Sequence, residues 1–418
     1  MALSLVCLRC NYEELLQFEK GFPYSCPSCD GILDVRYDAV RLSRAAFVSC
    51  FQKRGSSFSM WRYAPFLPLP TEIAPITLHE GGTPLVEADA LSSKSDGIRV
   101  YIKDETRNPT GSFKDRPIGL GVNYALRAGY TQLVVASSGN GAVSTAAYAA
   151  RAAISALVVV PRSSSHSPKL RQARAYGARV LLLDGDYRDV FRITQQLMSH
   201  LPVADMTTTF GSPIPTEGNK TVAYELYEQM GGEVPDWILV PVGAGPLLWG
   251  TWKGYGELLK CELTCKMPRM VAVQATGCAP IAQAYDQGRR DVEACLQPDT
   301  IADGISDGLL DHELDGAQTL SAIYASRGAA VAVADEITLR ALKEMASKVG
   351  VFAEPTGAIG LAGMWELQAR GMLRPGESIV LMVTGHGLKR PDAIEESSLD
   401  LVPPRLDAVL NYLGAAKL

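Results

Sequence analysis

Four cysteines near the start of the chain form two close pairs with the spacing of a metal site. Cys7 and Cys10 make the first Cys-x-x-Cys pair, and Cys26 and Cys29 follow after fifteen residues. Each pair can hold a metal ion from a tight turn, and four thiolates complete a tetrahedral zinc shell. Such a shell has no open position, so we predict a structural zinc ion. The alternative is four free thiols that are close only along the chain.

A lysine-containing segment offers a second kind of chemistry. It reads Asn108-Pro109-Thr110-Gly111-Ser112-Phe113-Lys114-Asp115-Arg116. The first four residues are typical of a turn, Ser112 can cap, and we expect a helix from near Phe113 toward Gly129. A lysine in the first turn is poorly matched to the positive end of the helix dipole. Most lysines simply face solvent, and the residue types alone leave that alternative open for Lys114.

Two further segments place glycines between an apolar run and a helix. Residues 133–136 lead into Ser137-Ser138-Gly139-Asn140-Gly141, and residues 237–242 lead into Gly243-Ala244-Gly245-Pro246-Leu247-Leu248. Backbone N–H groups at a helix N-terminus suit an anion, so we expect a carboxylate at the first loop and a phosphate at the second. Each loop alone is a weak signal, because strand, glycine and helix follow one another in many α/β proteins.

The lysine segment resembles the cofactor-lysine segment of the threonine synthases, which use pyridoxal phosphate (PLP). The resemblance extends to Thr384-Gly385-His386-Gly387-Leu388-Lys389 and covers about residues 78–391. It implies that Lys114 carries PLP covalently. The other implied cofactor contacts are a phosphate loop, a partner of the phenolic oxygen and a partner of the pyridine nitrogen: in that order Gly243, Ala244, Gly245 and Leu247, then Asn140, then Thr384. A hydroxyl at the pyridine nitrogen would make PLP a weaker electron sink than a carboxylate would.

The resemblance also implies an amino acid as the small-molecule substrate. Its carboxylate would lie on the first loop, formed by Ser137, Ser138, Gly139 and Asn140. Lys114, once released from the cofactor, would act as general base at the α-carbon, which permits elimination or replacement at the β- or γ-carbon. In threonine synthases the leaving group is the phosphate of O-phosphohomoserine, and water is the nucleophile. His386 is expected only to satisfy loop carbonyls.

Two prolines depart from the family pattern. Pro246 stands where the phosphate loop more often has glycine, and it removes a backbone donor. Pro215 precedes the Glu217-Gly218 pair by two positions, where threonine synthases have an arginine for the substrate phosphate. Three basic residues are candidates for replacing that charge: Arg107, Arg116 and Lys220. Arg116 has an equal alternative as an ion-pair partner within the fold.

These departures leave other functions open beside threonine synthase. One is β-replacement on a serine- or threonine-type substrate, as in an enzyme resembling cysteate synthase. Another is a threonine or serine dehydratase. A non-enzymatic alternative is a zinc-ribbon scaffold that has lost catalysis, which would be colourless, whereas bound PLP absorbs visible light.

Apolar runs alternate with longer amphipathic stretches along most of the chain. Continuous apolar strands that alternate with helices predict parallel sheets covered on both faces. The resemblance implies the same class: PLP fold type II, similar to the tryptophan synthase β-subunit, with two open α/β lobes around the cofactor and commonly a homodimer. The apolar runs are residues 133–136, 156–160, 179–183, 237–240, 270–273 and 379–383.

The chain divides into a short head and a long body. Residues 1–38 are predicted to form a zinc-ribbon-like head that ends in a strand at 32–37, and residues 39–78 an irregular linker packed on the body. Residues 79–418 are predicted to form the two-lobed catalytic region, with the smaller lobe at about 125–215.

Composition excludes several classes of function. The 418 residues are 47% hydrophobic and 20% charged, with a net charge of −5, so no basic surface for nucleic acid is expected. No apolar run reaches about 18 residues, which argues against a membrane span. The first residues lack the pattern of a secretion signal, and the nine cysteines suit reduced thiols. We therefore expect a cytoplasmic protein.

Overall fold

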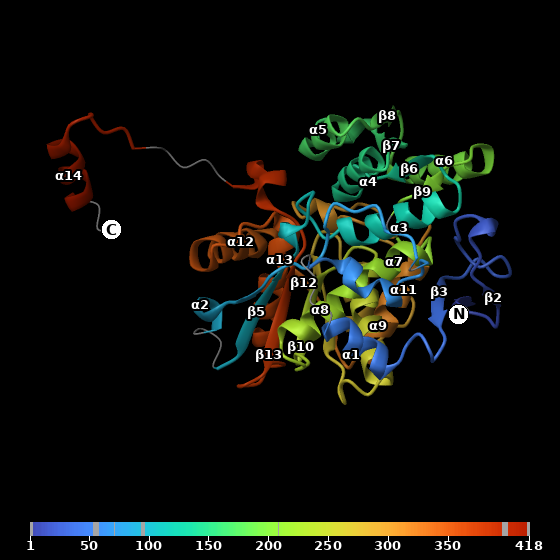
Figure 1. The fold of residues 1–418 in the computed structure, drawn as a ribbon. Helices are drawn as coiled ribbons and strands as arrows, with labels where there is room; N and C mark the ends of the chain where they lie inside the picture. Colours follow the sequence, from blue (N-terminus) through green and yellow to red (C-terminus); the bar gives the residue numbers. More distant parts are fainter. Residues whose placement is uncertain are drawn as a thin grey trace.

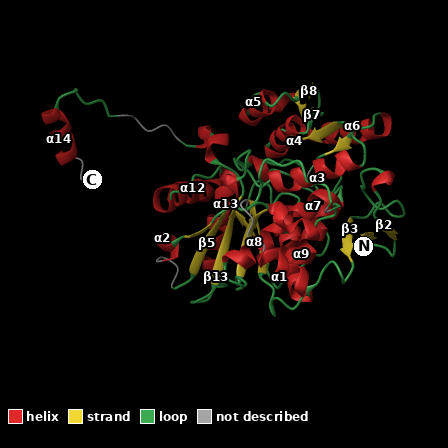
Figure 2. Cartoon of the chain, in the orientation of Figure 1, coloured by secondary structure: helices red, strands yellow, loops and turns green. Residues whose placement is uncertain are grey.

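The structure is a computed structural model that describes residues 3–52, 58–70, 72–92, 97–207, 209–394 and 400–415. Three β-sheets organise these residues (Figures 1 and 2). The strands are β1 (Leu3–Cys7), β2 (Glu13–Leu15), β3 (Leu33–Tyr37), β4 (Leu85–Glu87), β5 (Arg99–Asp104), β6 (Gln132–Ala136), β7 (Ser155–Pro161), β8 (Arg179–Leu183), β9 (Ala204–Asp205), β10 (Trp237–Pro241), β11 (Arg269–Ala275), β12 (Ala329–Val333) and β13 (Ser378–Val383).

Helices connect the strands and cover the sheets. The α-helices are α1 (Arg44–Gln52), α2 (Asp89–Ser92), α3 (Asp115–Arg127), α4 (Asn140–Arg151), α5 (Pro168–Ala175), α6 (Tyr187–His200), α7 (Pro213–Asn219), α8 (Thr221–Gln229), α9 (Pro246–Lys260), α10 (Pro280–Asp286), α11 (Glu313–Ala325), α12 (Asp335–Val349), α13 (Pro355–Ala369) and α14 (Leu406–Ala415). Among the helices described here, none is both long and apolar enough to span a membrane.

The largest sheet has the strand order β12-β11-β10-β13-β5-β4. Its neighbours are parallel except for the antiparallel edge pair β4 and β5. All residues of β10 and β13 are buried, as expected for strands with helices on both faces. Ile238 and Val240 of β10 pack into one core with α8, α9 and α11, whereas Leu239 packs into a second core with α12 and α13. The predicted parallel sheet between two helical layers is thus confirmed.

A second, four-stranded sheet forms the smaller lobe, with the order β8-β7-β6-β9 and all pairs parallel. It lies above the large sheet in Figure 1, together with α4, α5 and α6. In both large and small sheets, the carboxyl ends of parallel strands meet at one edge, which is where ligands bind in open α/β sheets. The loops that carry the candidate residues follow β5, β6, β10 and β13 at these edges.

The head is a small antiparallel sheet of order β2-β1-β3. Its strand β3 reaches a buried charged cluster on the body. Lys253 Nζ of α9 donates to Asp34 Oδ1 at 2.7 Å and to Glu217 Oε1 at 2.5 Å, and the Tyr37 hydroxyl donates to Glu217. Lys220 Nζ lies 3.7 Å from the centroid of the Tyr37 ring. Polar groups of the head therefore complete the interior of the body.

The segment after the head is more ordered than the predicted irregular linker. Residues 44–52 form α1, and Phe47 stacks on Phe66 with ring centroids 3.8 Å apart. Both rings and Tyr63 are fully buried in the core that contains α8 and α9. The segment is therefore part of the body's core. At the other end of the chain, α14 lies apart from the body in Figure 1.

Candidate active site

The loop that carries Lys114 is joined to the turn that follows β13. Phe113 N donates to Thr384 O at 3.0 Å, and His386 N donates to Gly111 O at 3.0 Å. The first turn of α3 begins at Asp115, so Lys114 is the residue that caps the helix. Asp115 holds the loop from below, because its carboxylate accepts from Thr110 N at 2.7 Å. Burial raises the pKa of Asp115 to about 6, although its hydrogen bonds oppose the rise.

Asn140 lies against the same turn from the smaller lobe. Its Nδ2 donates to Glu354 Oε1 at 2.7 Å, and Glu354 N donates to Gly385 O at 2.9 Å. A side chain on Gly385 would collide with Glu354, because an added Cβ would lie 2.1 Å from Oε1. The segments of Lys114, Asn140 and Thr384 are therefore held together by backbone and side-chain hydrogen bonds, although they are far apart along the chain.

The glycine loop after β10 has the geometry of an anion cradle. Gly245 has φ +105°, and an added Cβ would lie 2.0 Å from Thr319 Oγ1. The Thr319 hydroxyl donates to Ala244 O at 2.7 Å and fixes the loop from behind. Within the described part of the chain, the N–H groups of Gly243, Ala244 and Gly245 donate to no protein acceptor. Such unused donors at the start of α9 suit a phosphate.

Several buried polar atoms around Lys114 also have no protein partner among the described residues. They are Ser112 Oγ, Asn140 Oδ1 and Thr384 Oγ1. Buried polar atoms are normally hydrogen-bonded, so three such atoms in adjoining loops indicate a missing polar ligand. The donor set fits PLP, which has a phosphate, a phenolic oxygen and a ring nitrogen. Ser137, Ser138 and Gly139 form the neighbouring loop that opens α4.

The Lys114 amine lies close to a carboxylate that the sequence did not reveal. Burial lowers the pKa of Lys114 to about 8, against the opposing effect of Asp307. Asp307 packs against Gly243, since an added Cβ there would lie 3.1 Å from Asp307 Cβ. His312 Nε2 lies 3.1 Å from Asp307 Oδ1. Burial lowers the pKa of His312, but the bond to Asp307 raises it further, to about 9. The Asp307–His312 pair is thus ionised near neutral pH.

Arg116 and Lys220 do not lie where a substrate contact would require. Both side chains are completely buried. The Arg116 guanidinium is 2.7 Å from both Glu105 and Glu225, while Lys220 Nζ is 3.0 Å or less from Glu217 and Glu257. Their charges are already neutralised inside the body. This placement contradicts the prediction that they contact substrate, and it gives both residues a role in the fold.

The other residues of the predicted substrate region are placed differently. Arg107 is exposed, at the end of the short 3₁₀ helix η3 (Glu105–Arg107). Pro215 is buried in α7, where its ring faces α3 at Gly121, 3.4 Å from a Cβ added there. Pro246 is the first residue of α9, a position where a missing N–H costs no helical hydrogen bond. The position of Pro215 is therefore filled by an apolar ring within a helix contact.

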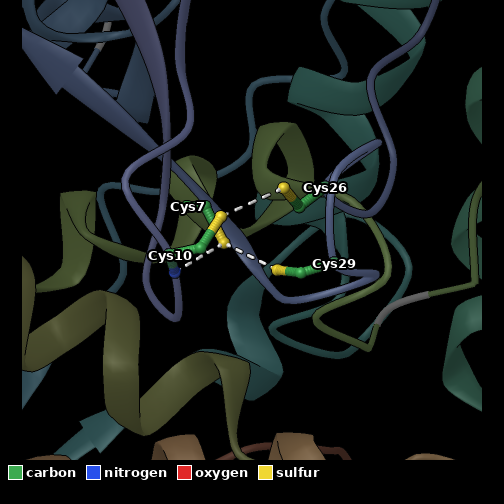
Figure 3. A group of neighbouring side chains, drawn as sticks. All are labelled: Cys7, Cys10, Cys26 and Cys29. Atoms are coloured by element: carbon green, nitrogen blue, oxygen red, sulfur yellow. Dashed lines mark hydrogen bonds between the residues drawn. The ribbon is translucent and has the colours of Figure 1, made fainter.

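The four head cysteines point toward one another (Figure 3). Their sulfur atoms all lie within 4.8 Å of one another. Cys7 Sγ is 3.6 Å from Cys29 Sγ, and Cys10 Sγ is 3.7 Å from Cys26 Sγ. Distances near 3.7 Å are those between thiolates that share a tetrahedral zinc ion with bonds of about 2.3 Å. All four cysteines are free of disulfides.

The sequence matches known PLP enzymes over most of its length. The family model "Pyridoxal-phosphate dependent enzyme" matches residues 76–385. The threonine synthase of Methanocaldococcus jannaschii is 35% identical over 390 residues, 93% of this chain and 94% of that protein. The threonine synthase of Methanosarcina acetivorans is 34% identical over 418 residues, 99% of each chain.

Solved structures share the fold. The crystal structure of a threonine deaminase from the source abbreviated T.th. has a TM-score of 0.62 and 26% identity, and the match covers 76% of this chain and 94% of that one. An O-ureido-L-serine synthase has a TM-score of 0.63 at 21% identity, with 82% and 100% covered, which supports the fold alone. The chain therefore belongs to the PLP-dependent enzymes, as a threonine-synthase-family lyase of fold type II that catalyses elimination or replacement at the β- or γ-carbon of an amino acid.

Proposed function

We propose that Lys114 is the lysine that binds PLP and then transfers protons at the substrate's α-carbon. The observation that carries this proposal is the set of unpartnered atoms around it, on Ser112, Asn140 and Thr384. A pKa near 8 leaves part of the Lys114 population neutral at physiological pH, and only a neutral amine can accept a proton. The cofactor, when bound, supplies the electron sink that stabilises negative charge at the α-carbon.

The neighbouring residues would orient cofactor and substrate. Thr384 Oγ1 would face the ring nitrogen and Asn140 the phenolic oxygen, while the N–H groups of residues 243–245 would hold the phosphate. Ser137, Ser138 and Gly139 would bind the substrate carboxylate at the start of α4, where the helix dipole favours an anion. The ionised Asp307 near Lys114 would favour the protonated form of its amine whenever it takes up a proton.

Among named activities we propose threonine synthase first: O-phosphohomoserine and water give threonine and phosphate. Full-length similarity to threonine synthases supports this choice. The test is to incubate the purified holoenzyme with O-phosphohomoserine, O-phosphoserine, serine, threonine and homoserine, and to identify the products by mass spectrometry. Threonine and phosphate from O-phosphohomoserine, at rates above those of the other substrates, would support the assignment. A faster conversion of another substrate would refute it.

A specific observation favours a second candidate function. The position of the family's phosphate-binding arginine is Pro215, and Arg116 and Lys220 are neutralised by glutamates. Each lost charge-assisted contact weakens a phosphate ligand by roughly 1.5–3 kcal/mol. A β-replacement enzyme on a serine- or threonine-type substrate, or a threonine or serine dehydratase, would not need those contacts. Oxo-acid or replacement products from serine or threonine in the same assay would identify this function.

We also propose a structural zinc ion bound by Cys7, Cys10, Cys26 and Cys29. The converging sulfur atoms support it, and the ion would have no open position for substrate. A homodimer and a cytoplasmic location are proposed from the family resemblance. Sedimentation of the purified holoenzyme checks the first, and fractionation of the source cells checks the second.

A further inference from the structure

A second pocket lies behind the loop that carries Lys114. Its volume is about 430 Å³, and none of the residues proposed to bind PLP lines it. Thr110 and Gly111 form one wall, and the turn after β13 contributes His386 and Lys389. The remaining wall is α5, with Lys169 and Gln172. The pocket therefore adjoins the active-site loops but is distinct from the cofactor contacts.

Lys389 is an unusual residue in this pocket because its buried charge is unpaired. Its side chain is 7% exposed. Lys389 Nζ donates to Gln172 Oε1 at 3.2 Å, and no carboxylate oxygen of the described residues lies within 4.0 Å. The other buried lysines, Lys103, Lys169 and Lys220, each have a carboxylate oxygen within 3.0 Å. A buried charge without a counter-charge is unfavourable, so its retention indicates a ligand that supplies one.

The surroundings of Lys389 are arranged for an anion. Gly111 has φ +82°, and a Cβ there would lie 3.1 Å from Lys389 Cε, so glycine makes room for the lysine stem. The N-terminus of α5 lines the pocket through Pro168 and Lys169, and the side chain of its N-cap Ser167 donates to Ser138 O instead of capping the helix. The first N–H groups of α5 are therefore not capped by that hydroxyl, and the helix dipole favours negative charge there.

His386 offers a further donor. Its Nδ1 accepts from Leu388 N at 3.1 Å, which places the proton of a neutral ring on Nε2. Lys169 adds little positive charge, because Glu354 Oε2 and Asp303 Oδ1 lie 2.8 and 2.9 Å from its Nζ. Lys389 is thus the cation left to balance an anionic ligand in this pocket.

We propose that this pocket binds a phosphate-like oxyanion, with Lys389 as the counter-charge and His386 and the start of α5 as hydrogen-bond donors. The phosphate can belong to the substrate or be the free phosphate released in the reaction, and both have the same chemistry. The choice between these sources rests on the proposed lyase function, whereas the site itself does not. Phosphate held here would replace the contact that Pro215 cannot make.

Calorimetric titration of the holoenzyme with inorganic phosphate tests the site. PLP fills the glycine loop in the holoenzyme, so that loop does not compete. We expect Lys389→Gln to weaken phosphate binding at pH 7 by tenfold or more, since a charge-assisted contact is lost. Lys389→Arg keeps the charge and should retain binding, and Lys260→Gln at the exposed end of α9 is the matched control. Binding should also weaken as the pH rises through about 8, where Lys389 loses its proton.

Equal phosphate affinity of wild type and Lys389→Gln, or no binding by wild type at millimolar phosphate, would overturn the proposal. The PLP absorbance of each sample is recorded separately, so a failure of the cofactor assignment is distinguishable from a failure of the site.

Steady-state kinetics separates the two sources. If the substrate carries the phosphate, Lys389→Gln raises KM for O-phosphohomoserine at least tenfold and leaves KM for an unphosphorylated amino acid unchanged. If the ligand is released phosphate, the variant keeps its KM but is no longer inhibited by added phosphate. Unchanged KM together with unchanged product inhibition would contradict both sources and with them the site.

Discussion

Replacing Gly245 with alanine should weaken PLP binding through a collision that the structure defines. The residue has φ +105°, a conformation that costs an L-residue roughly 1–2 kcal/mol. The new Cβ would lie 2.0 Å from Thr319 Oγ1 and 2.6 Å from Thr319 Cγ2. Thr319 is completely buried, so it cannot rotate into solvent, and the loop must move instead.

The expected magnitude combines three losses. Moving Thr319 or the loop breaks the 2.7 Å hydrogen bond to Ala244 O, which contributes about 1 kcal/mol. Together with the backbone strain, the free energy of unfolding should fall by roughly 2–4 kcal/mol. If the displaced loop loses one or two N–H contacts to the PLP phosphate, at about 1.5–3 kcal/mol each, PLP affinity should fall at least tenfold.

Gly350→Ala is the matched control, because Gly350 has φ +72° and nothing lies within 4 Å of an added Cβ. It should lose stability through strain but keep the wild-type affinity for PLP. The assays are urea unfolding of the apoprotein and titration of the apoprotein with PLP, followed by absorbance. Wild-type PLP affinity in Gly245→Ala, or an equal loss of affinity in Gly350→Ala, would refute the reasoning. Gly245→Ala combined with Thr319→Ala should recover part of the affinity, since the closest atoms are removed.

Three further outcomes are expected. Borohydride reduction and peptide mapping should place the pyridoxyl mass on Lys114, and Lys114→Ala should bind PLP non-covalently without turnover; modification of a different lysine would contradict this. The Cys7→Ser, Cys10→Ser double variant should lose zinc and unfold at lower urea concentration, because the metal's binding energy stabilises the head; unchanged zinc content by metal analysis would exclude the site. His312 stabilises the fold fully below its unfolded pKa near 6.5 and loses this effect as the pH rises through about 9, a change of roughly 2–3 kcal/mol. His312→Asn should remove that pH dependence from urea unfolding curves, and identical curves would show that the ion pair contributes nothing.

Local sequence signals could predict the sheets and the lysine and cysteine segments. The apolar runs became β6, β7, β8, β10, β11 and β13 because strands buried on both faces need apolar residues at every position. The cysteine pairs could be found because each pair spans only one turn. The helix α1 was missed, although Phe47, Cys50 and Phe51 have the i, i+3, i+4 spacing of a helix face.

Long-range placement could not be predicted in the same way. Arg116 is two residues from Lys114, but two positions on a helix differ by about 200°, so its guanidinium enters the body while Lys114 faces the loops. Asp307 is far from Lys114 along the chain, and only the packing of the loops brings them together. The sequence around Asp307 and His312 contains no motif that would have revealed the pair.

The contact between β3 and α9 bears on whether the head is a detachable module. Lys253 shares its ammonium between Asp34 of the head and Glu217 of α7, and Tyr37 donates to the same glutamate. A protein trimmed after residue 38 would leave Glu217 and Lys253 facing a hole where a strand had been. Transplanting the head onto another enzyme, or exchanging it for a different metal-binding unit, would therefore require matching changes in α7 and α9. In this protein the head and the catalytic region behave as one inherited unit, whose boundary can be drawn along the chain but not through the interior.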